Sequence, residues 1–323
     1  MFEGRRILVT GGGGFIGSHL VKRLVELNAD VNIVARNIKN LWRLKEVLPV
    51  ISIHSADIQK REEIDFLVSN IKPEYIFHLS AYGVSSEDRD IYKALDTNVY
   101  GIIHVLNAGI KYGCKRFINI GTCAEYGNKK DSITEDFSLN PVDIYGSTKA
   151  AATVIAHQIA GENHIEIVTL RLFGVFGEYE SRHKIFCHAI MTLLEDKDLE
   201  LTSCSQIRDY CYVQDIIEAI IRAAADDKVA NEVFNVGSGE AYPLKYYIEL
   251  IHDLMKSKRK LLFGALEDRR PELWHPIPDI CKIKRKLGWR PEKCLDENLL
   301  KTISWYKNNF QYYIKKAEIK GVD

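Results

Sequence analysis

Short apolar runs alternate with amphipathic segments along the first half of the chain. The run RILVT at residues 6–10 is almost continuously apolar, as in a strand that is buried on both faces. Similar runs predict further strands, at residues 31–35, 51–54, 75–79, 116–120 and 166–171. Helical spacing of the apolar residues between them predicts helices, at residues 14–28, 41–48, 62–71, 91–112 and 145–161. Strands that alternate with helices predict an α/β fold with a Rossmann-type doubly wound parallel sheet.

The composition is that of an ordinary globular protein, with 323 residues of which 46% are hydrophobic and 27% are charged. Because 44 Lys and Arg residues balance 44 Asp and Glu residues, the formal net charge is zero. A neutral chain argues against nucleic acid and membrane surfaces as partners, and we interpret the basic clusters at residues 256–260 and 282–286 as solvated helix ends. No apolar run reaches membrane-spanning length.

The seven cysteines are scattered, with no CxxC pair and no metal-ligand spacing to histidine, so no metal site is predicted. An odd number of cysteines without a signal peptide is typical of a reducing compartment. We therefore expect a cytoplasmic protein.

A glycine-rich segment, GGGGFIG, follows the first strand and opens the first helix. In this context Gly11 permits a tight turn, Gly14 lets the backbone approach a pyrophosphate, and Gly17 lets the helix pack closely on the strand. The amides at the start of the helix, at Phe15 and Ile16, attract phosphate. The segment therefore predicts a dinucleotide-binding site.

The end of the second strand predicts which dinucleotide is bound. NAD-binding proteins usually place an acidic residue there, about 20 residues beyond the glycines, to hold the ribose hydroxyls. Here Ala35 stands at that point and Arg36 follows it, whereas Asp30 lies at the wrong end of the strand. A guanidinium without a competing carboxylate suits a 2′-phosphate. We predict NADP(H), with NAD(H) left open if Arg36 is only solvated.

Tyr145 and Lys149 have the spacing YxxxK, which places both side chains on one face of a helix. A phenol with a pKa near ~10 is a poor base, but an adjacent ammonium group favours its ionised form. The tyrosine can then exchange a proton with a substrate oxygen. Thr122 ends the preceding strand, and its hydroxyl can orient the same oxygen.

These motifs resemble those of the extended short-chain dehydrogenase/reductases, in the branch of nucleotide-sugar epimerases, dehydratases and reductases. The resemblance extends from Arg6 to about Tyr306. It is carried, besides the glycines and the Tyr145–Lys149 pair, by HLSA at residues 78–81, NVYG at 98–101, RDYCYVQD at 208–215, FNVGSG at 234–239 and LGW at 287–289.

The resemblance implies roles for residues at matching positions, with Thr122, Tyr145 and Lys149 as the catalytic group. The implied additional cofactor-binding residues are Asp57, Ile58, Leu79, Ser80, Ala81, Asn98 and Phe173. The implied substrate-binding residues are Tyr82, Cys123, Ala124, Gly174, His183, Arg208 and Arg270. Arginine suits the pyrophosphate of a nucleotide sugar, although Arg208 can instead form a structural ion pair with a neighbouring acid, and His183 can be an exposed histidine without a role.

The resemblance also implies a division into two parts. Residues 1–181 would bind the cofactor, with later segments returning to this domain, and residues 182–323 would form a smaller mixed α/β region that binds the nucleotide sugar. Helical patterns in this region lie at residues 185–194, 215–225, 244–255 and 295–306. Family members pair the helices at residues 91–112 and 145–161 across a dimer, so we expect a homodimer formed through a four-helix bundle.

The segment GTCAEYG at residues 121–127 discriminates between the family's reactions. In the 4,6-dehydratases of the family that this chain resembles, two acidic residues follow the threonine. This chain has Cys123 and Ala124 at those positions. Glu125 is one residue off, which on an extended segment points it to the other face. Family members that epimerise C3 and C5 use a cysteine at the position of Ala124. Because Cys123 is one residue away from that position, we interpret it as a small buried residue without a catalytic role.

Two reactions that need only a hydride and one proton remain. The first is reduction of a 4-keto-6-deoxyhexose, linked to a nucleoside diphosphate, by NADPH. The second is epimerisation at C4 with retained NAD. Ala35 and Arg36 favour the reductase. A non-catalytic NADP-binding protein would usually have lost Tyr145 or Lys149. Relatives often have Asn at the position of Gly174, which predicts a different pose of the bound sugar.

Overall fold

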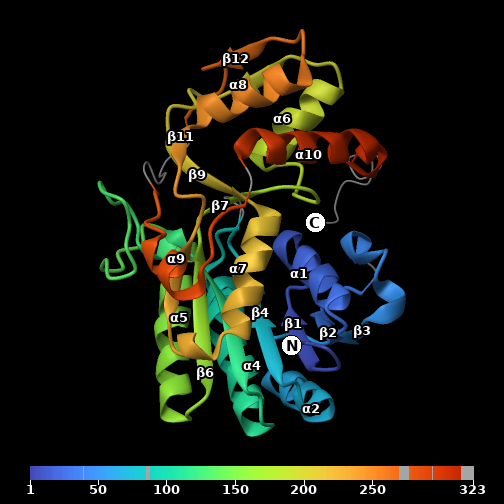
Figure 1. Cartoon of the computed structure of the whole chain (residues 1–323), viewed down its shortest axis with the longest axis vertical. Coiled ribbons are helices and arrows are strands. Elements are labelled where there is room, and N and C mark those ends of the chain that lie inside the picture. Colours follow the sequence, from blue (N-terminus) through green and yellow to red (C-terminus); the bar gives the residue numbers. More distant parts are fainter. Residues whose placement is uncertain (39, 85–87, 269–275, 293, 314–323) are drawn as a thin grey trace.

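The computed structural model describes residues 1–38, 40–84, 88–268, 276–292 and 294–313 (Figure 1). Of the predicted site residues, Arg270 lies outside the described residues.

A seven-stranded parallel sheet forms the larger part of the molecule, in the order β10-β6-β5-β4-β1-β2-β3. Its strands are β1 (Arg6–Thr10), β2 (Asp30–Ala35), β3 (Ser52–Ser55), β4 (Tyr75–His78), β5 (Arg116–Thr122), β6 (Glu166–Leu172) and β10 (Val233–Val236). Strand β1 pairs with β2 on one side and β4 on the other, so the order of the strands reverses there. Such a switch point leaves a crevice at the carboxyl ends of the strands. The predicted doubly wound Rossmann fold is confirmed.

Helices cover both faces of this sheet. Because side chains alternate along a strand, Ile7 and Val9 point to one face and Leu8 points to the other. Ile7 and Val9 share a core with α1 (Phe15–Glu26) and α7 (Val213–Ala225), which pack together. Leu8 belongs to a second core with the remaining helices, α2 (Arg61–Ile71), α4 (Gly101–Lys111) and α5 (Ile144–Glu162).

The smaller part lies beyond the carboxyl ends of the large sheet (Figure 1). It contains a three-stranded sheet of β11 (Ala241–Pro243), β9 (Ile207–Tyr212) and β7 (Gly174–Phe176), and a pair formed by β12 (Leu261–Phe263) and β8 (Leu199–Leu201). Its helices are α6 (Ile185–Leu194), α8 (Leu244–Met255) and α10 (Leu295–Asn308), while α9 (Cys281–Leu287) packs against β10. Strand β7 precedes residue 181 and β10 follows it, so the two parts interleave along the chain. A domain boundary at this residue stays a prediction.

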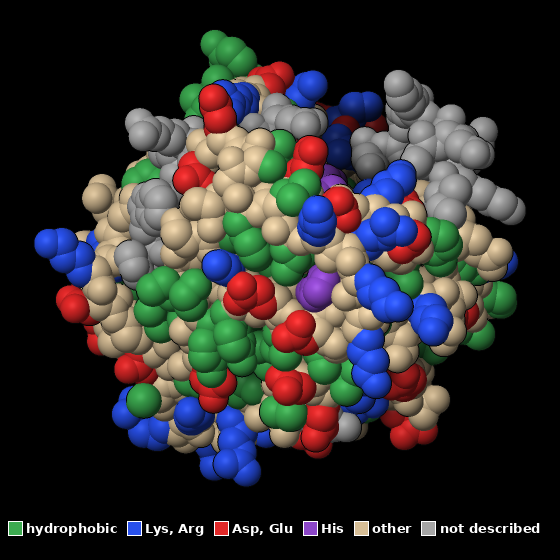
Figure 2. Space-filling model, turned by 90° about the horizontal axis from the view of Figure 1, so that it is seen from above, with side chains coloured by type: hydrophobic (Ala, Val, Ile, Leu, Met, Phe, Trp, Pro, Cys, Tyr) green, Lys and Arg blue, Asp and Glu red, His purple; other side chains and the backbone are tan. Residues whose placement is uncertain are grey.

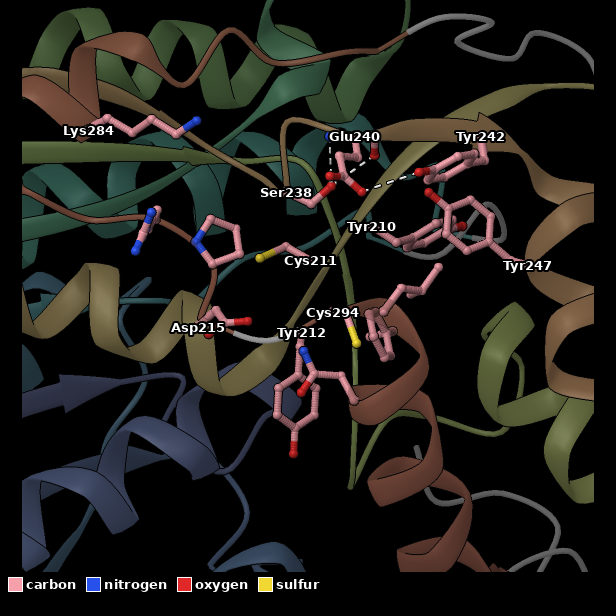
Figure 3. Close-up of a pocket in the computed structure, with 15 residues that line it drawn as sticks. Tyr210, Cys211, Tyr212, Asp215, Ser238, Glu240, Tyr242, Tyr247, Lys284 and Cys294 are labelled. Carbon is pink, nitrogen blue, oxygen red and sulfur yellow. Dashed lines mark hydrogen bonds between the residues drawn. The ribbon is translucent and has the colours of Figure 1, made fainter. Parts of the chain in front are cut away.

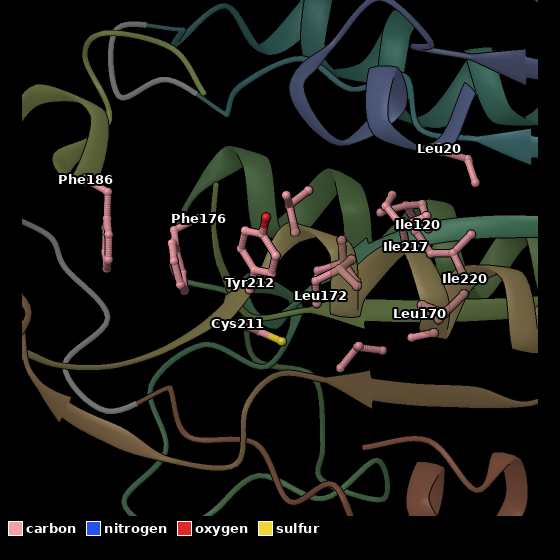
Figure 4. Packing of buried hydrophobic residues seen from close by; sticks show 14 of the residues in the cluster. Leu20, Ile120, Leu170, Leu172, Phe176, Phe186, Cys211, Tyr212, Ile217 and Ile220 are labelled. Carbon is pink, nitrogen blue, oxygen red and sulfur yellow. The ribbon is translucent and has the colours of Figure 1, made fainter. Parts of the chain in front are cut away.

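One apolar cluster runs through both parts. It joins side chains of α1, β5, β6 and α7 to those of β7, α6 and β9 (Figure 4). The aromatic members Phe176 and Phe186 stack with their ring centroids 4.9 Å apart. Because close-packed side chains resist relative movement, this shared core holds the smaller part against the end of the large sheet.

Two predicted helices differ from the structure. Residues 41–48 form two short 3-10 turns, Trp42–Leu44 and Leu48–Val50, because Pro49 cannot donate to a helical ladder and restricts the residue before it. The predicted helix at residues 91–112 consists of α3 (Ile91–Ala94), a π-helical segment (Leu95–Tyr100) and α4. The strands of the smaller part are mostly three residues long, which is too short for an alternating pattern to reveal.

Candidate active site

The glycine-rich loop closes against the ends of two strands. Gly11 has a φ of +70°, and a Cβ there would lie 2.8 Å from the carbonyl carbon of Leu79. A Cβ at Gly17 would lie 2.1 Å from the Gly11 carbonyl oxygen, so the helix contacts the loop through bare backbone. Helix α1 begins after Gly14 without a side-chain cap, which leaves its first amides open to an anion. This cradle fits the pyrophosphate of a dinucleotide.

A groove of about 610 Å³ extends from this loop along the carboxyl ends of the strands. Twelve of the predicted site residues line it: Gly11, Gly14, Phe15, Ile16, Gly17, Arg36, Asp57, Ile58, Leu79, Ser80, Ala81 and His183. Other residues that line the groove are not predicted from the sequence, among them Asn40, Leu41, Glu180, Ser181 and Lys184. These residues lie on irregular segments, where no periodic pattern marks them.

Arg36 directly follows β2 and lines the groove with an exposed side chain. Among the described residues it has no hydrogen bond or ion pair. Ala35, at the end of the strand, offers no carboxylate, and the Asp57 carboxylate accepts the Gln59 amide at 3.1 Å. A free guanidinium is therefore available at this end of the groove.

The three predicted catalytic residues come together at the end of β5. Thr122 is the last residue of that strand, and Tyr145 and Lys149 lie one turn apart on α5. The start of α5 is fixed by Asp143, whose carboxylate accepts the Gly146 amide at 2.6 Å. The Thr122 side chain acts directly on the Tyr145 hydroxyl, since it lowers the pKa of that phenol.

Burial controls the protonation of this group. Burial raises the pKa of Tyr145 above its ordinary value, and the Thr122 side chain only partly opposes this shift. Burial also lowers the pKa of Lys149, and the charge of Glu125 opposes that shift. The Lys149 Nζ donates to the Ile120 carbonyl at 2.6 Å. The phenol is therefore held in its protonated form at neutral pH and can act as a general acid.

Asn98 clamps a loop beside the catalytic helix. Its Oδ1 accepts the Tyr82 amide at 2.8 Å, and its Nδ2 donates to the Tyr82 carbonyl and the Thr148 hydroxyl, each at 2.9 Å. The loop continues to Gly83, where a Cβ would lie 3.3 Å from the Cβ of Tyr145. Asn98 belongs to the π-helical segment, a feature frequent at functional sites. It does not line the groove but holds the loop next to Tyr145.

Two of the predicted substrate-binding residues surround Thr122. Cys123 is half-buried, and burial raises the pKa of its thiol to about 12 although Arg208 opposes the shift. The thiol therefore stays protonated and close to the Arg208 guanidinium. Ala124 packs through its backbone on α5, where a Cβ at Gly146 would lie 2.5 Å from its carbonyl oxygen.

Close packing explains why position 174 holds a glycine and not the asparagine of many relatives. Gly174 pairs with Tyr210 across β7 and β9, and a Cβ there would lie 2.3 Å from the Asp209 carbonyl oxygen and 2.7 Å from the Tyr210 ring. An asparagine cannot occupy this position without moving β9. Phe173, the neighbouring residue, is buried in a small cluster with Tyr126 and Ile133 rather than in the groove.

A second hollow, of about 280 Å³, lies between β9, β11, α8 and the chain around α9 and α10 (Figure 3). Tyrosines dominate its wall, with Tyr210, Tyr242 and Tyr247 lying close together. None of the predicted site residues lines it. The candidate active site is therefore the groove together with the corner at Thr122.

The described residues contain no group of three or more His, Cys, Asp or Glu side chains that could hold a metal ion. All seven cysteines are free thiols. In the same described ranges, no helix has the length and apolar character needed to span a membrane. On the face seen in Figure 2, basic and acidic side chains are interspersed, in keeping with the net charge of zero.

Comparison with known proteins identifies the family. Residues 7–237, which include the groove loops and the catalytic group, match the NAD dependent epimerase/dehydratase family. The chain belongs to this family. It is therefore an enzyme of the extended short-chain dehydrogenase/reductase type, as the sequence motifs predicted.

Similar proteins of this family catalyse different reactions. A UDP-glucose 4-epimerase of Bacillus subtilis is 28% identical over 97% of this chain and 99% of its own length. A dTDP-glucose 4,6-dehydratase of Neisseria meningitidis is 27% identical over 94% of each chain. Among solved structures, a UDP-glucose 4-epimerase of Thermotoga maritima, in complex with UDP-glucose, has a TM-score of 0.88 and 28% identity, covering 94% of this chain and 99% of that protein.

Proposed function

We propose that the protein uses NADPH to reduce the C4 carbonyl of a 4-keto-6-deoxyhexose linked to a nucleoside diphosphate. The observation that carries this proposal is the end of β2, where Ala35 replaces the acid expected for NAD and Arg36 faces the groove without a described partner. A 2′-phosphate would neutralise this guanidinium. A reductase must release its oxidised cofactor after each turnover, and NADPH is the usual cellular reductant.

The protonation of the catalytic corner suits a reduction. When bound, the nicotinamide supplies a hydride to the sugar carbon. Tyr145, which is protonated at neutral pH and whose pKa burial raises further, donates its proton to the C4 oxygen, and Thr122 orients that oxygen. Lys149, one turn further along α5, supplies the positive charge that stabilises the phenolate that remains. His183, Arg208 and Arg270 are the side chains that we expect to hold the nucleotide and its phosphates.

Dehydration is a poorer match to the residues present. Elimination of water from the sugar needs an acid and a base beside the threonine, and neither Cys123 nor Ala124 supplies a carboxyl group. Glu125 is fully buried and paired with Arg171, so it does not face the substrate side. The side chain is turned away as expected, but the reason differs, because Cys123–Glu125 is a 3-10 turn and not an extended segment.

A second candidate is epimerisation at C4 with retained NAD. It is supported by the full-length similarity to UDP-glucose 4-epimerases. This reaction also needs only Tyr145, Thr122 and the dinucleotide, but Tyr145 would first have to accept a proton. A lower pKa of the phenol in the presence of oxidised cofactor would favour it.

We further propose that the active form is a homodimer. Tyr92, Tyr100 and Val154 lie on or beside the helices expected to pair, and their side chains are 76%, 53% and 58% exposed. Two such helices from each subunit would bury these apolar groups in a four-helix bundle. Light scattering at micromolar concentration is expected to give a mass near 74 kDa, twice the 36.9 kDa of the chain, and Val154→Asp is expected to give monomers.

The first experiment measures the loss of nicotinamide absorbance from NADPH and from NADH with a panel of nucleotide-linked 4-keto-6-deoxyhexoses. Oxidation with any of them, faster with NADPH, supports the reductase. No oxidation, together with interconversion of UDP-glucose and UDP-galactose without added cofactor, would establish the epimerase instead. Tyr145→Phe serves as the inactive control in both assays.

A further inference from the structure

A buried ion pair lies beneath the catalytic corner. The Nε of Arg171 is 2.8 Å from Oε2 of Glu125, and the two side chains are 6% and 0% exposed. Arg171 also donates to the Tyr126 hydroxyl at 2.8 Å, which in turn donates to Oδ1 of Asn235 at the same distance. The pair therefore joins the segment after β5 to β6 and, through Asn235, to β10.

The other carboxylate oxygen of Glu125 reaches the catalytic threonine. Its Oε1 accepts the Thr122 amide at 2.9 Å, while the Thr122 hydroxyl oxygen accepts the Ala124 amide at 3.3 Å. These reciprocal hydrogen bonds form a capping box around the short turn Cys123–Glu125. The backbone that carries the catalytic hydroxyl is therefore held directly by the Glu125 carboxylate.

The same carboxylate acts electrostatically on the other two catalytic side chains. Its charge raises the pKa of Lys149, against the effect of burial, and it also raises the pKa of Tyr145. Close packing keeps water away, since a Cβ at Gly121 would lie only 2.6 Å from Oε1 of Glu125. In such a dry environment a fixed charge acts strongly over short distances.

Other groups around the two side chains have weaker or different effects. Lys149 also faces His78, whose imidazole is buried and neutral and contacts Thr10. Tyr145 also faces Cys123, held as a thiol, and Asp143, whose carboxylate caps α5. Glu125 is thus the buried carboxylate that acts on both Tyr145 and Lys149.

We propose that Glu125, held by Arg171, is a positioning residue of the active site. Its carboxylate fixes the backbone that carries the Thr122 hydroxyl and supplies the negative charge that favours the ammonium form of Lys149, one turn from Tyr145 on α5. The proposal rests on the proposed catalytic roles of Thr122, Tyr145 and Lys149, and its kinetic test rests on Tyr145 as the proton donor, but neither depends on the identity of the sugar.

The test is Glu125→Gln, which keeps an oxygen for the Thr122 amide and removes the charge. Loss of the charge lowers the pKa of both Lys149 and Tyr145, so the alkaline limb of the kcat profile is expected to move down by roughly 1 pH unit. We expect kcat at pH 8 to fall about tenfold while KM changes less than threefold. Glu178→Gln is the matched control, because Glu178 is also buried but bonds Tyr212 outside the groove.

A second variant separates misfolding from loss of charge. Glu125→Gln leaves Arg171 buried without its partner, whereas Glu125→Gln with Arg171→Met removes both charges and is expected to fold while keeping the shifted pH profile. A folded Glu125→Gln enzyme with kcat within twofold and an unshifted alkaline limb would overturn the proposal.

If the wild-type protein reduces none of the sugars offered, the proposed function fails but this inference is still tested. In that case the titration of the Lys149 side chain is followed by nuclear magnetic resonance in labelled protein. A midpoint that is lower in Glu125→Gln than in the wild type supports the inference, and an unchanged midpoint contradicts it.

Discussion

Two charged residues next to the active site, Glu125 and Arg36, have opposite surroundings. Glu125 lies at the floor of the catalytic corner, fully buried, with one oxygen on Arg171 and the other on the Thr122 amide. Arg36 lines the groove directly after β2, where its side chain is exposed and has no partner among the described residues. In the sequence, each residue follows the end of a strand by a few positions at most. Each also lies one residue beyond a position that is acidic in related proteins, which is Ala124 for Glu125 and Ala35 for Arg36.

The difference shows how environment assigns a role to a charge. A buried charge must be paired, and once paired it is a rigid part of the site that can orient its neighbours. An exposed charge costs little to maintain and remains available to a ligand. We therefore expect substitutions in the buried pair of Glu125 and Arg171 to alter catalysis or folding, and substitution of Arg36 to alter the choice of cofactor.

The largest effect on kcat is expected for Tyr145→Phe, which removes the proposed proton donor on α5. We expect kcat to fall by about 10²- to 10⁴-fold, the usual contribution of a general acid. Binding of NADPH, measured by fluorescence titration, is expected to change less than twofold. Tyr246→Phe, an exposed change on α8, is the control. Full activity of Tyr145→Phe would contradict the catalytic role of Tyr145.

Arg171→Met tests how much the buried pair of Glu125 and Arg171 contributes to the free energy of unfolding. It leaves the Glu125 carboxylate buried without its partner, which typically costs about 3–5 kcal/mol of unfolding free energy. Denaturant unfolding of the variant measures this loss. Adding Glu125→Gln to the same chain is expected to recover most of it, because the unpaired charge is then gone. Equal stability of the single and double variants would mean that the pair is not the cause.

Arg36→Ala tests whether the exposed guanidinium determines the choice between NADPH and NADH. Loss of the guanidinium is expected to raise KM for NADPH by roughly 10- to 100-fold, the value of one or two charge-assisted hydrogen bonds. KM for NADH should change less than twofold, because that cofactor carries no 2′-phosphate. Arg285→Ala, an exposed change on α9, is the control. An equal rise for both cofactors would contradict the predicted contact.

Glu180 is an intermediate case, a buried acid on the groove wall whose Oε2 has no hydrogen-bond partner among the described residues. Burial raises its pKa from 4.5 to about 8, and Lys184 only partly opposes this. The folded chain therefore binds a proton more tightly than the unfolded chain, so the contribution of Glu180 to stability is full below about pH 4.5 and is lost as pH rises to about 8.

Because glutamine does not titrate, Glu180→Gln is expected to gain stability relative to the wild type as pH rises through this window. We expect a gain of about 1–2 kcal/mol at pH 8 that disappears near pH 5, less than the full pKa shift implies because the site borders the groove. Thermal melts at several pH values measure it. Glu218→Gln on the surface of α7 is the control, and a pH-independent difference would indicate a packing effect.

Much of the fold could be predicted from the sequence because its signals are local. Strand β1 was predicted at its observed bounds, and the glycine loop and the Tyr145–Lys149 pair depend on contacts within a few residues. The π-helical segment was not predicted, although Asn98 was identified, because one extra residue in a helical turn hardly changes the apolar pattern.

The sequence by itself therefore determined the alternating sheet, the phosphate cradle, the tyrosine and lysine on one helix face, and the family. Only the tertiary structure decided that Glu125 meets Arg171, 46 residues further along the chain, and that Tyr210 fills the space beside Gly174. It also decided that Ser181 and Lys184 line the same groove as Arg36. Periodicity records which face of an element is buried, but the neighbours of a side chain are set by segments distant in sequence, which local patterns cannot record.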